Sequence, residues 1–372
     1  MWEKPQFQPA QILYAPKEAR FQPGSRCFQG IPSVERTAKG RLFACFYGGE
    51  LEEQHGNYAV LAVSDDTGYT WTEPYLVVSH PDERMRVFDP CLWMDPLGRL
   101  WWFWSQQETS QFDGVGGVWY VRCDRPDTEH LTFTAPVRFA NGVMMNKPTV
   151  LKDGTWLFPC AIWTDHCYEG MPVVQGLKEE RFSNVYASRD NGNTIFLLGS
   201  ADVPNRCFDE HMTVELSDNR ILMLVRTHYG IGKSFSCDGG KTWTPGEDSG
   251  IRGPNSRFFI RKLASGRILL VNHYHFQGRN NLTAMLSEDD CVSWKGFLLL
   301  DERGAVSYPD GTEYTQGNLY IVYDRERGGS HEYKNHSDAA REILFAKITE
   351  EDILAGRLVS AGSRLKCIAD KL

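Results

Sequence analysis

An eight-residue segment recurs along this chain and constrains its fold more than any other feature. Its two fullest copies begin at Ser64 and Ser236 and read Ser-Asp-Asp-Thr-Gly-Tyr-Thr-Trp and Ser-Cys-Asp-Gly-Gly-Lys-Thr-Trp. A Ser and an Asp two residues apart can hydrogen-bond the backbone of a tight turn, Gly permits a positive φ, and Thr-Trp begins the next strand. Each octet therefore predicts a β-hairpin turn.

Two weaker copies begin at Ser188, where the Trp is missing, and at Ser287, where the Gly is missing. The starts at 188, 236 and 287 lie 48 and 51 residues apart, within the range of a four-stranded propeller blade. The wider gap between 64 and 188 leaves room for one more blade, whose turn has decayed to the Arg-Cys-Asp of residues 122–124.

The repeat predicts an all-β chain, a six-bladed β-propeller with four-stranded antiparallel blades that forms one domain over residues 1–372. The predicted blades cover approximately residues 28–78, 86–140, 145–200, 208–248, 255–300 and 312–348. Residues 10–14 are predicted to be a strand that closes the ring by pairing into the last blade. Residues 349–355 predict a short helix with Thr349 as its N-cap.

Composition excludes several classes of partner. The formal charge of −8 and the absence of a basic run argue against nucleic acid and against an anionic membrane surface. No segment approaches the ~18 apolar residues that a membrane-spanning helix needs. The 11 Trp, 15 Tyr and 20 Phe suit aromatic packing between sheets and would equally suit a sugar site.

The ten cysteines show no Cys-x-x-Cys pair and no zinc spacing, so we expect no metal and no cofactor. The first residues have neither the basic start nor the apolar run of a signal peptide. We therefore expect a cytoplasmic protein, or a secreted one if a signal has been removed.

Two polar clusters lie where innermost strands of a propeller would begin. Asp209 and Glu210 precede an apolar strand, and Arg226 ends the strand after it. Such a pair of carboxylates suits a general base, a ligand-binding pair or a solvated loop. Tyr308 and Asp310 flank a proline in a Pro-Asp-Gly turn, so Tyr308 could be a packing residue or part of a site.

These residues carry a resemblance to the sialidases. The octets resemble the Asp boxes of that family, and its site motifs occur here in the family's order. In sialidases a glutamate precedes a Val-Glu-Leu strand, and Glu210 matches that glutamate here. An arginine ends the following strand in sialidases, and Arg226 matches that arginine. A second arginine, in an Arg-x-x-Leu segment before an Asp box, is matched by Arg279.

The family's nucleophilic tyrosine lies fifteen residues before a Tyr-Glu pair. Tyr308 lies fifteen residues before Tyr323, which Asp324 follows. The resemblance implies that Tyr308 attacks or stabilises the anomeric centre and that Glu210 takes its proton. A neutral tyrosine avoids the repulsion between a carboxylate nucleophile and the carboxylate of a sialic acid, which three arginines normally bind.

The chain departs from the family in two places. Gly30 stands where the first arginine of the triad is expected, in Phe-Gln-Gly-Ile-Pro. Losing one arginine weakens carboxylate binding by ~1.5–3 kcal/mol, so another acidic or a neutral sugar is a possible substrate. The loop that should carry the acid/base aspartate has none, and its candidates for proton transfer, if it is not simply solvated, are Glu50, Glu52, Glu53 and His55.

Further polar residues occupy equivalent places in other blades. Asp89, Lys147 and Arg257 begin the inner strands of blades two, three and five, where they could bind substrate or form structural ion pairs. Asp310 is a further candidate for binding substrate. His273 and His275 alternate by two and are predicted to share a strand face, for packing or sugar stacking rather than for a metal.

The sequence therefore predicts a sialidase-like glycoside hydrolase with a carbohydrate substrate. Tyr308 and Glu210 would act at the anomeric centre, Glu50 or Glu53 would be the acid/base, and Arg226 and Arg279 would bind an anionic group. Two alternatives remain: a sugar-acid lyase or isomerase that uses the same residues, and a non-catalytic carbohydrate-binding propeller.

Overall fold

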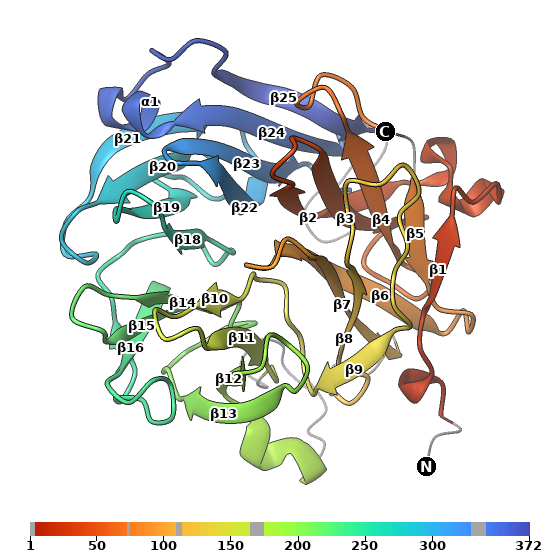
Figure 1. The fold of residues 1–372 in the computed structure, drawn as a ribbon, viewed down its shortest axis with the longest axis horizontal. Helices are drawn as coiled ribbons and strands as arrows, with labels where there is room; N and C mark the ends of the chain where they lie inside the picture. Colours follow the sequence, from red (N-terminus) through yellow and green to blue (C-terminus); the bar gives the residue numbers. More distant parts are fainter. Residues whose placement is uncertain (1–3, 73–74, 109–113, 164–174, 329–339) are drawn as a thin grey trace.

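Six antiparallel β-sheets surround a common axis in the computed structural model, which describes residues 4–72, 75–108, 114–163, 175–328 and 340–372 (Figure 1). Apart from β1, each sheet consists of four strands that are consecutive in the chain, because each strand pairs with the next one through a turn. The chain therefore travels once around the ring. The prediction of a six-bladed β-propeller is confirmed.

The six blades contain the following strands: β1 (Gln11–Tyr14), β2 (Phe28–Arg36), β3 (Leu42–Gly49), β4 (Tyr58–Ser64) and β5 (Leu76–Ser79) in blade one; β6 (Met85–Met94), β7 (Leu100–Glu108), β8 (Val118–Cys123) and β9 (Val137–Ala140) in blade two; β10 (Thr149–Val150), β11 (Trp156–Ala161), β12 (Ser183–Ser188) and β13 (Phe196–Ala201) in blade three; β14 (Met212–Glu215), β15 (Ile221–Thr227), β16 (Gly230–Ser236) and β17 (Glu247–Asp248) in blade four; β18 (Phe259–Lys262), β19 (Ile268–His273), β20 (Leu282–Ser287) and β21 (Lys295–Asp301) in blade five; β22 (Val306–Thr315), β23 (Asn318–Arg325), β24 (Glu342–Thr349) and β25 (Arg364–Lys371) in blade six.

The second strand of each blade is buried on both faces, because a neighbouring blade covers each face. Strand β7 shows the consequence, since Trp101 and Phe103 pack into the apolar cluster on one face while Trp102 and Trp104 pack into the cluster on the other. Such strands read as continuous apolar runs rather than as alternating ones. Trp156, from blade three, joins the Trp101 face and thereby fixes two blades together.

The octets form the turns that their sequence predicts. The Asp238 carboxylate accepts hydrogen bonds from the backbone N–H of Thr242 at 2.9 Å and from its hydroxyl at 2.7 Å, while the Ser236 hydroxyl accepts the Gly240 N–H at 2.9 Å. Gly240 has a φ of +96°, and Cys291 adopts +70° where the fourth octet lacks glycine. The same carboxylate contacts recur at Asp66, Asp190 and Asp289.

The predicted relic of an octet at residues 122–124 does not bond in this way, because Asp124 pairs with the Arg122 side chain instead. The predicted helix is confirmed as α1 (Glu350–Ala355). The Thr349 hydroxyl and the Asp352 carboxylate form a reciprocal capping box, and Gly356 ends the helix with a φ of +63°. No helix among the described residues is long and apolar enough to cross a membrane.

The N-terminal strand lies elsewhere than predicted. Strand β1 pairs with β5, from Gln11 opposite Ser79 to Tyr14 opposite Leu76, and so adds a fifth strand to blade one. The last blade needs no strand from the N-terminus, because β25 pairs with β24 and supplies its outermost strand. The prediction that this strand closes the last blade is therefore wrong.

Hydrogen bonds and an ion pair join the first and last blades instead of a shared strand. The Asp370 carboxylate on β25 lies 3.2 Å from the Arg26 guanidinium and accepts a hydrogen bond from the Gln29 amide at 2.7 Å. The backbone N–H of Gln29 donates to the Arg327 carbonyl at 3.0 Å. Because these side chains are buried, the closure depends on each of them keeping its partner.

We predict that Asp370→Ala lowers the free energy of unfolding by about 3–5 kcal/mol, because it leaves the Arg26 charge buried without its carboxylate. Guanidinium chloride unfolding of the two proteins measures this difference. Asp218→Ala serves as the control, since its ion pair with Arg220 is about half exposed and its loss should cost less than about 1 kcal/mol. Equal losses in both variants would contradict the closure role of Asp370.

Candidate functional site

Three inner strands carry the same backbone irregularity, and it positions two of the predicted site residues. The register of β2, β6 and β22 shifts at Ile31-Pro32, Asp89-Pro90 and Tyr308-Pro309. The residue before each proline has a positive φ: +56°, +48° and +53°, respectively. A bulge of this kind redirects a side chain out of the regular alternation and is frequent beside active sites. The bulges of blades two and six thus place Asp89 and Tyr308.

The start of blade four is a strained segment. Phe208, Asp209 and Glu210 have successive φ values of +59°, +54° and +42°, a conformation that costs energy for residues other than glycine. The Asp209 carbonyl accepts the Arg226 N–H at 2.8 Å, and its carboxylate accepts the Ser183 hydroxyl at 2.8 Å. Asp209 therefore holds the backbone of this segment in place, and the Glu210 carboxylate lies in the site beside Arg226.

A single nitrogen of Arg226 joins Glu210 to Tyr308. It donates to Glu210 Oε1 at 2.6 Å and to the Tyr308 hydroxyl at 3.2 Å. All three side chains are at least 94% buried. The second carboxylate oxygen of Glu210 has no hydrogen-bond partner among the described residues. A buried acceptor in this condition is unusual and suits a group that exchanges a proton or contacts a ligand.

The pKa of Tyr308 is raised above its ordinary value, first because the phenol is buried and second because Glu210 carries a negative charge nearby. The positive charges of Arg226, Arg279 and Arg327 act in the opposite direction. Tyr308 is therefore a neutral phenol at pH 7. To act as a nucleophile, Tyr308 has to give its proton to a base. Glu210 is the nearby candidate, because it binds the same Arg226 nitrogen as Tyr308.

Two further guanidinium groups flank the Tyr308 ring. The Cζ atom of Arg279 lies 5.4 Å from the ring centroid and that of Arg327 lies 4.6 Å from it. Asn255 ties the predicted arginines together, since its side-chain oxygen accepts from Arg226 at 2.6 Å and its carbonyl accepts from Arg279 at 3.2 Å. Sequence reasoning found Arg226 and Arg279 but missed Asn255 and Arg327, which follow no local motif.

Of the two predicted acid/base residues, the structure brings only Glu53 to this cluster. Its Oε1 lies 3.1 Å from a terminal nitrogen of Arg327, and its charge acts on Asp89. The Glu53 side chain is 41% exposed, at the rim of the cluster. Glu50 is exposed immediately after β3, and its charge acts on Tyr58, whose hydroxyl donates to the Arg20 carbonyl.

Asp89 is a buried carboxyl group within the same cluster. Burial, followed by the charges of Glu53 and Glu210, raises the pKa of Asp89 to about 8, although Arg86 and Arg257 act to lower it. Asp89 is therefore largely protonated at neutral pH and can donate a hydrogen bond.

Lys147, Arg257 and Asp310 lie in a buried ion cluster on the axis. The Lys147 ammonium lies 2.9 Å from a Glu35 oxygen and 3.0 Å from Asp310 Oδ2, and it donates to the Leu92 carbonyl at 2.7 Å. Arg257 lies 3.4 Å from the other Asp310 oxygen. Because the ammonium already binds this many protein groups, we assign Lys147 and Asp310 to holding the blades together.

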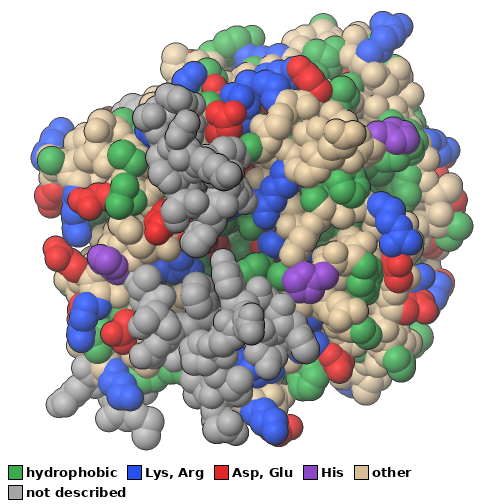
Figure 2. Space-filling model, turned by 180° about the vertical axis from the view of Figure 1, so that it is seen from behind, with side chains coloured by type: hydrophobic (Ala, Val, Ile, Leu, Met, Phe, Trp, Pro, Cys, Tyr) green, Lys and Arg blue, Asp and Glu red, His purple; other side chains and the backbone are tan. Residues whose placement is uncertain are grey.

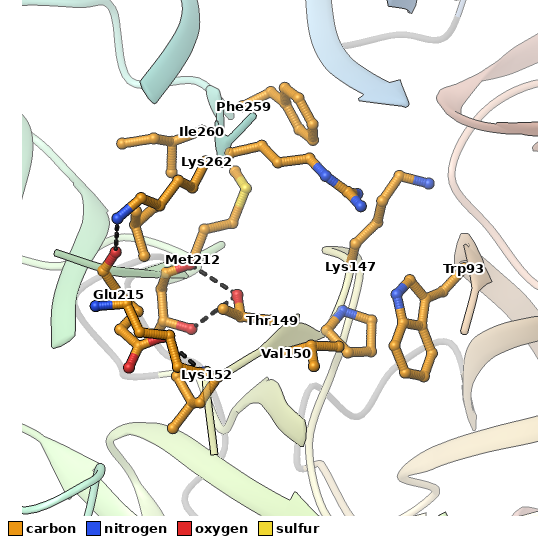
Figure 3. Close-up of a pocket in the computed structure, with 15 residues that line it drawn as sticks. Trp93, Lys147, Thr149, Val150, Lys152, Met212, Glu215, Phe259, Ile260 and Lys262 are labelled. Atoms are coloured by element: carbon orange, nitrogen blue, oxygen red, sulfur yellow. Dashed lines mark hydrogen bonds between the residues drawn. The ribbon is translucent and has the colours of Figure 1, made fainter. Parts of the chain in front are cut away.

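An axial cavity of about 340 Å³ lies between the inner strands of blades three, four and five (Figure 3). Thr149, Lys152, Glu215 and Lys262 line it, and the Lys262 ammonium donates to the Glu215 carbonyl at 3.0 Å. Tyr308, Glu210 and Arg226 are not among its lining residues. The cavity is therefore separate from the Tyr308 cluster.

His273 and His275 do not share a strand face as predicted, because β19 ends at His273. His273 is buried and bonded to the Asn280 carbonyl at 2.8 Å, whereas His275 is exposed beside the Tyr274 ring. Burial lowers the pKa of His273 to about 4, so it is a neutral packing residue at pH 7. In the described ranges, no group of three or more His, Cys, Asp or Glu side chains could hold a metal ion.

Figure 2 shows the face behind that of Figure 1, where a few Lys and Arg side chains are visible near the centre and others are spread over the rim. The guanidinium groups of Arg226, Arg279 and Arg327 around Tyr308 favour an anionic ligand.

A family model described as the BNR repeat-like domain matches residues 40–321 of the chain. This segment includes all four octets and most of the ring. The chain belongs to the BNR repeat-like domain family. A search of curated proteins found no match.

Solved structures of similar fold include several sialidases. A microbial sialidase named Hadza Hz136 is 18% identical with a TM-score of 0.65, over 82% of this chain and 65% of its own. The intramolecular trans-sialidase of Ruminococcus gnavus is 14% identical with a TM-score of 0.65, over 93% and 98%. A protein of unknown function from Dyadobacter fermentans is 18% identical with a TM-score of 0.63, over 86% and 96%. The family match confirms the predicted BNR-repeat propeller, and these low identities agree with the prediction that the chain shares the sialidase fold while diverging from true sialidases in sequence.

We predict that Asp89→Asn changes the pH dependence of stability. The pKa of Asp89 is about 8 in the folded protein and ordinary in the unfolded chain. The protonated carboxyl group therefore stabilises the folded protein fully below pH ~4, and this stabilisation is lost as the pH rises towards 8. The free energy of unfolding of Asp89→Asn relative to wild type should therefore rise by about 1 kcal/mol per pH unit between pH 5 and 8.

Urea unfolding at several pH values measures this difference. Asn also tolerates the positive φ of this position. The control is Asn191→Gly at an exposed turn position of positive φ, which leaves every titratable group in place, so its difference from wild type should be flat over the same range. A flat difference for Asp89→Asn as well would show that Asp89 is ionised in the folded protein.

Proposed function

We propose that this protein is a sialidase-like glycoside hydrolase whose substrate carries an anionic group at or beside the anomeric carbon. The observation that carries the proposal is the single Arg226 nitrogen that binds both Glu210 and Tyr308 in a buried cluster with two more guanidinium groups. A cluster that only packs the protein interior would not be expected to combine a neutral phenol, a carboxylate with one oxygen lacking a hydrogen bond and three cations.

In the proposed reaction, Tyr308 forms a bond to the anomeric carbon while the glycosidic C–O bond breaks. Glu210 accepts the phenol proton, and Arg226 stabilises the charge that develops on the phenol oxygen. Glu53 gives a proton to the leaving oxygen, because it lies at the exposed rim where that group departs. Water then attacks the anomeric carbon and Glu53 accepts a proton from it, while the bond between the Tyr308 oxygen and that carbon breaks and the released phenolate recovers its proton from Glu210.

The substrate class follows from charge. A carboxylate beside the anomeric carbon repels a carboxylate nucleophile but not a neutral tyrosine. Arg226 and Arg279 can bind the substrate carboxylate with charge-assisted hydrogen bonds, and protonated Asp89 can donate a bond to a sugar oxygen. The Ruminococcus gnavus trans-sialidase, which shares the fold, was crystallised with oseltamivir carboxylate, a ligand that carries a carboxylate.

We predict that wild type cleaves at least one member of a panel of sialosides and other acidic and neutral glycosides. Tyr308→Phe should lower kcat by a factor on the order of 10³ or more, and Glu210→Gln by about 10²–10⁴. Released sugar and any anhydro-sugar product would be measured by chromatography and mass spectrometry.

The matched control is Tyr58→Phe, which removes a phenol hydroxyl from another buried tyrosine and should leave kcat unchanged. Binding to a panel member without cleavage would support the carbohydrate-binding alternative. An unsaturated or isomerised sugar acid as product would support the lyase or isomerase. Full activity in Tyr308→Phe would contradict the proposed nucleophile.

A further inference from the structure

Gly30 leaves a space in blade one that a side chain from blade six fills. A Cβ atom added to Gly30 would lie 2.2 Å from Cδ and 2.5 Å from Cγ of Arg327. Real Cβ atoms do not approach other carbon atoms so closely. The aliphatic part of Arg327 therefore occupies the position where any side chain of residue 30 would begin.

From this position, the guanidinium of Arg327 reaches the Tyr308 cluster. Its Cζ atom lies 4.6 Å from the Tyr308 ring centroid, closer than that of Arg279, and one terminal nitrogen lies 3.1 Å from Glu53. Arg327 is only 7% exposed. Its charge also acts to lower the pKa of Tyr308. Arg327 is thus the third cation of the cluster, together with Arg226 and Arg279.

Asp324 completes the arrangement. One of its oxygens accepts the Ile31 N–H at 2.7 Å and lies 3.9 Å from Nε of Arg327, and the other accepts the Ser307 hydroxyl at 2.8 Å. The first oxygen would lie 2.9 Å from a Cβ on Gly30. A short carboxylate at 324 and no side chain at 30 are both needed for the path that Arg327 takes.

We propose that Arg327 supplies, from blade six, the third arginine that binds the carboxylate of the substrate, in place of the residue absent at Gly30. The inference rests on the proposed function, because it concerns the anionic substrate of that site. A guanidinium carries five N–H donors in a planar fork, so one arginine can bind both Glu53 and a substrate carboxylate. The site then has three cations for the substrate anion.

The test uses one ligand with and without its negative charge: oseltamivir carboxylate and its ethyl ester, titrated calorimetrically against the full chain. Arg327→Ala should weaken binding of the acid by about 10- to 100-fold and binding of the ester by less than about 3-fold. Arg327→Lys, which keeps the charge but loses the fork, should lie between wild type and alanine.

A variant that moves the arginine from residue 327 to residue 30 tests whether the two positions can supply the same guanidinium group. In Gly30→Arg combined with Arg327→Ala, the space vacated at 327 accepts the new side chain, and affinity for the acid should recover by about 10-fold over Arg327→Ala alone. The matched control is Arg325→Ala, which removes an arginine that pairs with Glu326 and Glu342 and should leave both affinities unchanged. Circular dichroism melts establish that each variant is folded.

The outcomes separate the inference from the function on which it rests. Acid-selective loss in Arg327→Ala supports the role of Arg327 even if no glycoside is cleaved, in which case only the hydrolase proposal fails. Equal loss for acid and ester, unchanged binding of the acid, or no binding of the acid by wild type would overturn the role of Arg327. Such a result would leave intact any cleavage that depends on Tyr308.

Discussion

The buried Lys147 ammonium on the axis is the contact on which the rest of the ring depends. It comes from the start of blade three and binds Glu35 of blade one, the Leu92 carbonyl of blade two and Asp310 of blade six. A buried cation is costly unless every partner is in place, so this cluster fixes the relative positions of four blades. Asp310 lies two residues after Tyr308, so the same cluster also holds the strand that carries the proposed nucleophile.

Around this fixed centre, backbone strain is concentrated where the candidate chemistry lies. Tyr308, Asp89 and Glu210 all have positive φ, and none of them is glycine. Each such conformation costs energy that the surrounding strands must offset. The bulges and the strained start of blade four have a shared effect, because they turn polar side chains from three blades towards one cluster. In a regular strand, these side chains would alternate between neighbouring apolar faces.

The chemistry of the cluster follows from how charges are combined there. Arg226, Arg279 and Arg327 surround a phenol whose pKa burial raises. Burial, followed by the charges of Glu53 and Glu210, raises the pKa of Asp89 to about 8. The site therefore combines three cations, a neutral phenol that shares an arginine with a carboxylate, and a neutral carboxyl group that can donate a hydrogen bond. A binding module would use the cations, whereas the pairing of Tyr308 with Glu210 favours catalysis.

The ring and several residues of the candidate site could be predicted from the amino-acid sequence alone. The octets specify turns through contacts within eight residues, and their spacing gives the length of a blade, so both can be predicted without tertiary information. The resemblance to sialidase motifs singled out Tyr308, Glu210, Arg226 and Arg279, and the structure brings these four residues into one cluster. The place of β1 could not be predicted, because pairing with β5 or with the last blade depends on which edge strand is left unpaired.

The remaining contacts of the candidate site form only when distant parts of the chain meet in the folded ring. Arg327 and Gly30 are separated by nearly the whole chain, and only closure of the ring brings the arginine over the glycine. Glu50 and Glu53 look alike in sequence, but among the described residues it is Glu53 that forms an ion pair with an arginine, at 3.1 Å from Arg327, while Glu50 is exposed. Local patterns encode turns and strands through neighbouring residues, whereas these contacts depend on distances between blades that no local pattern records.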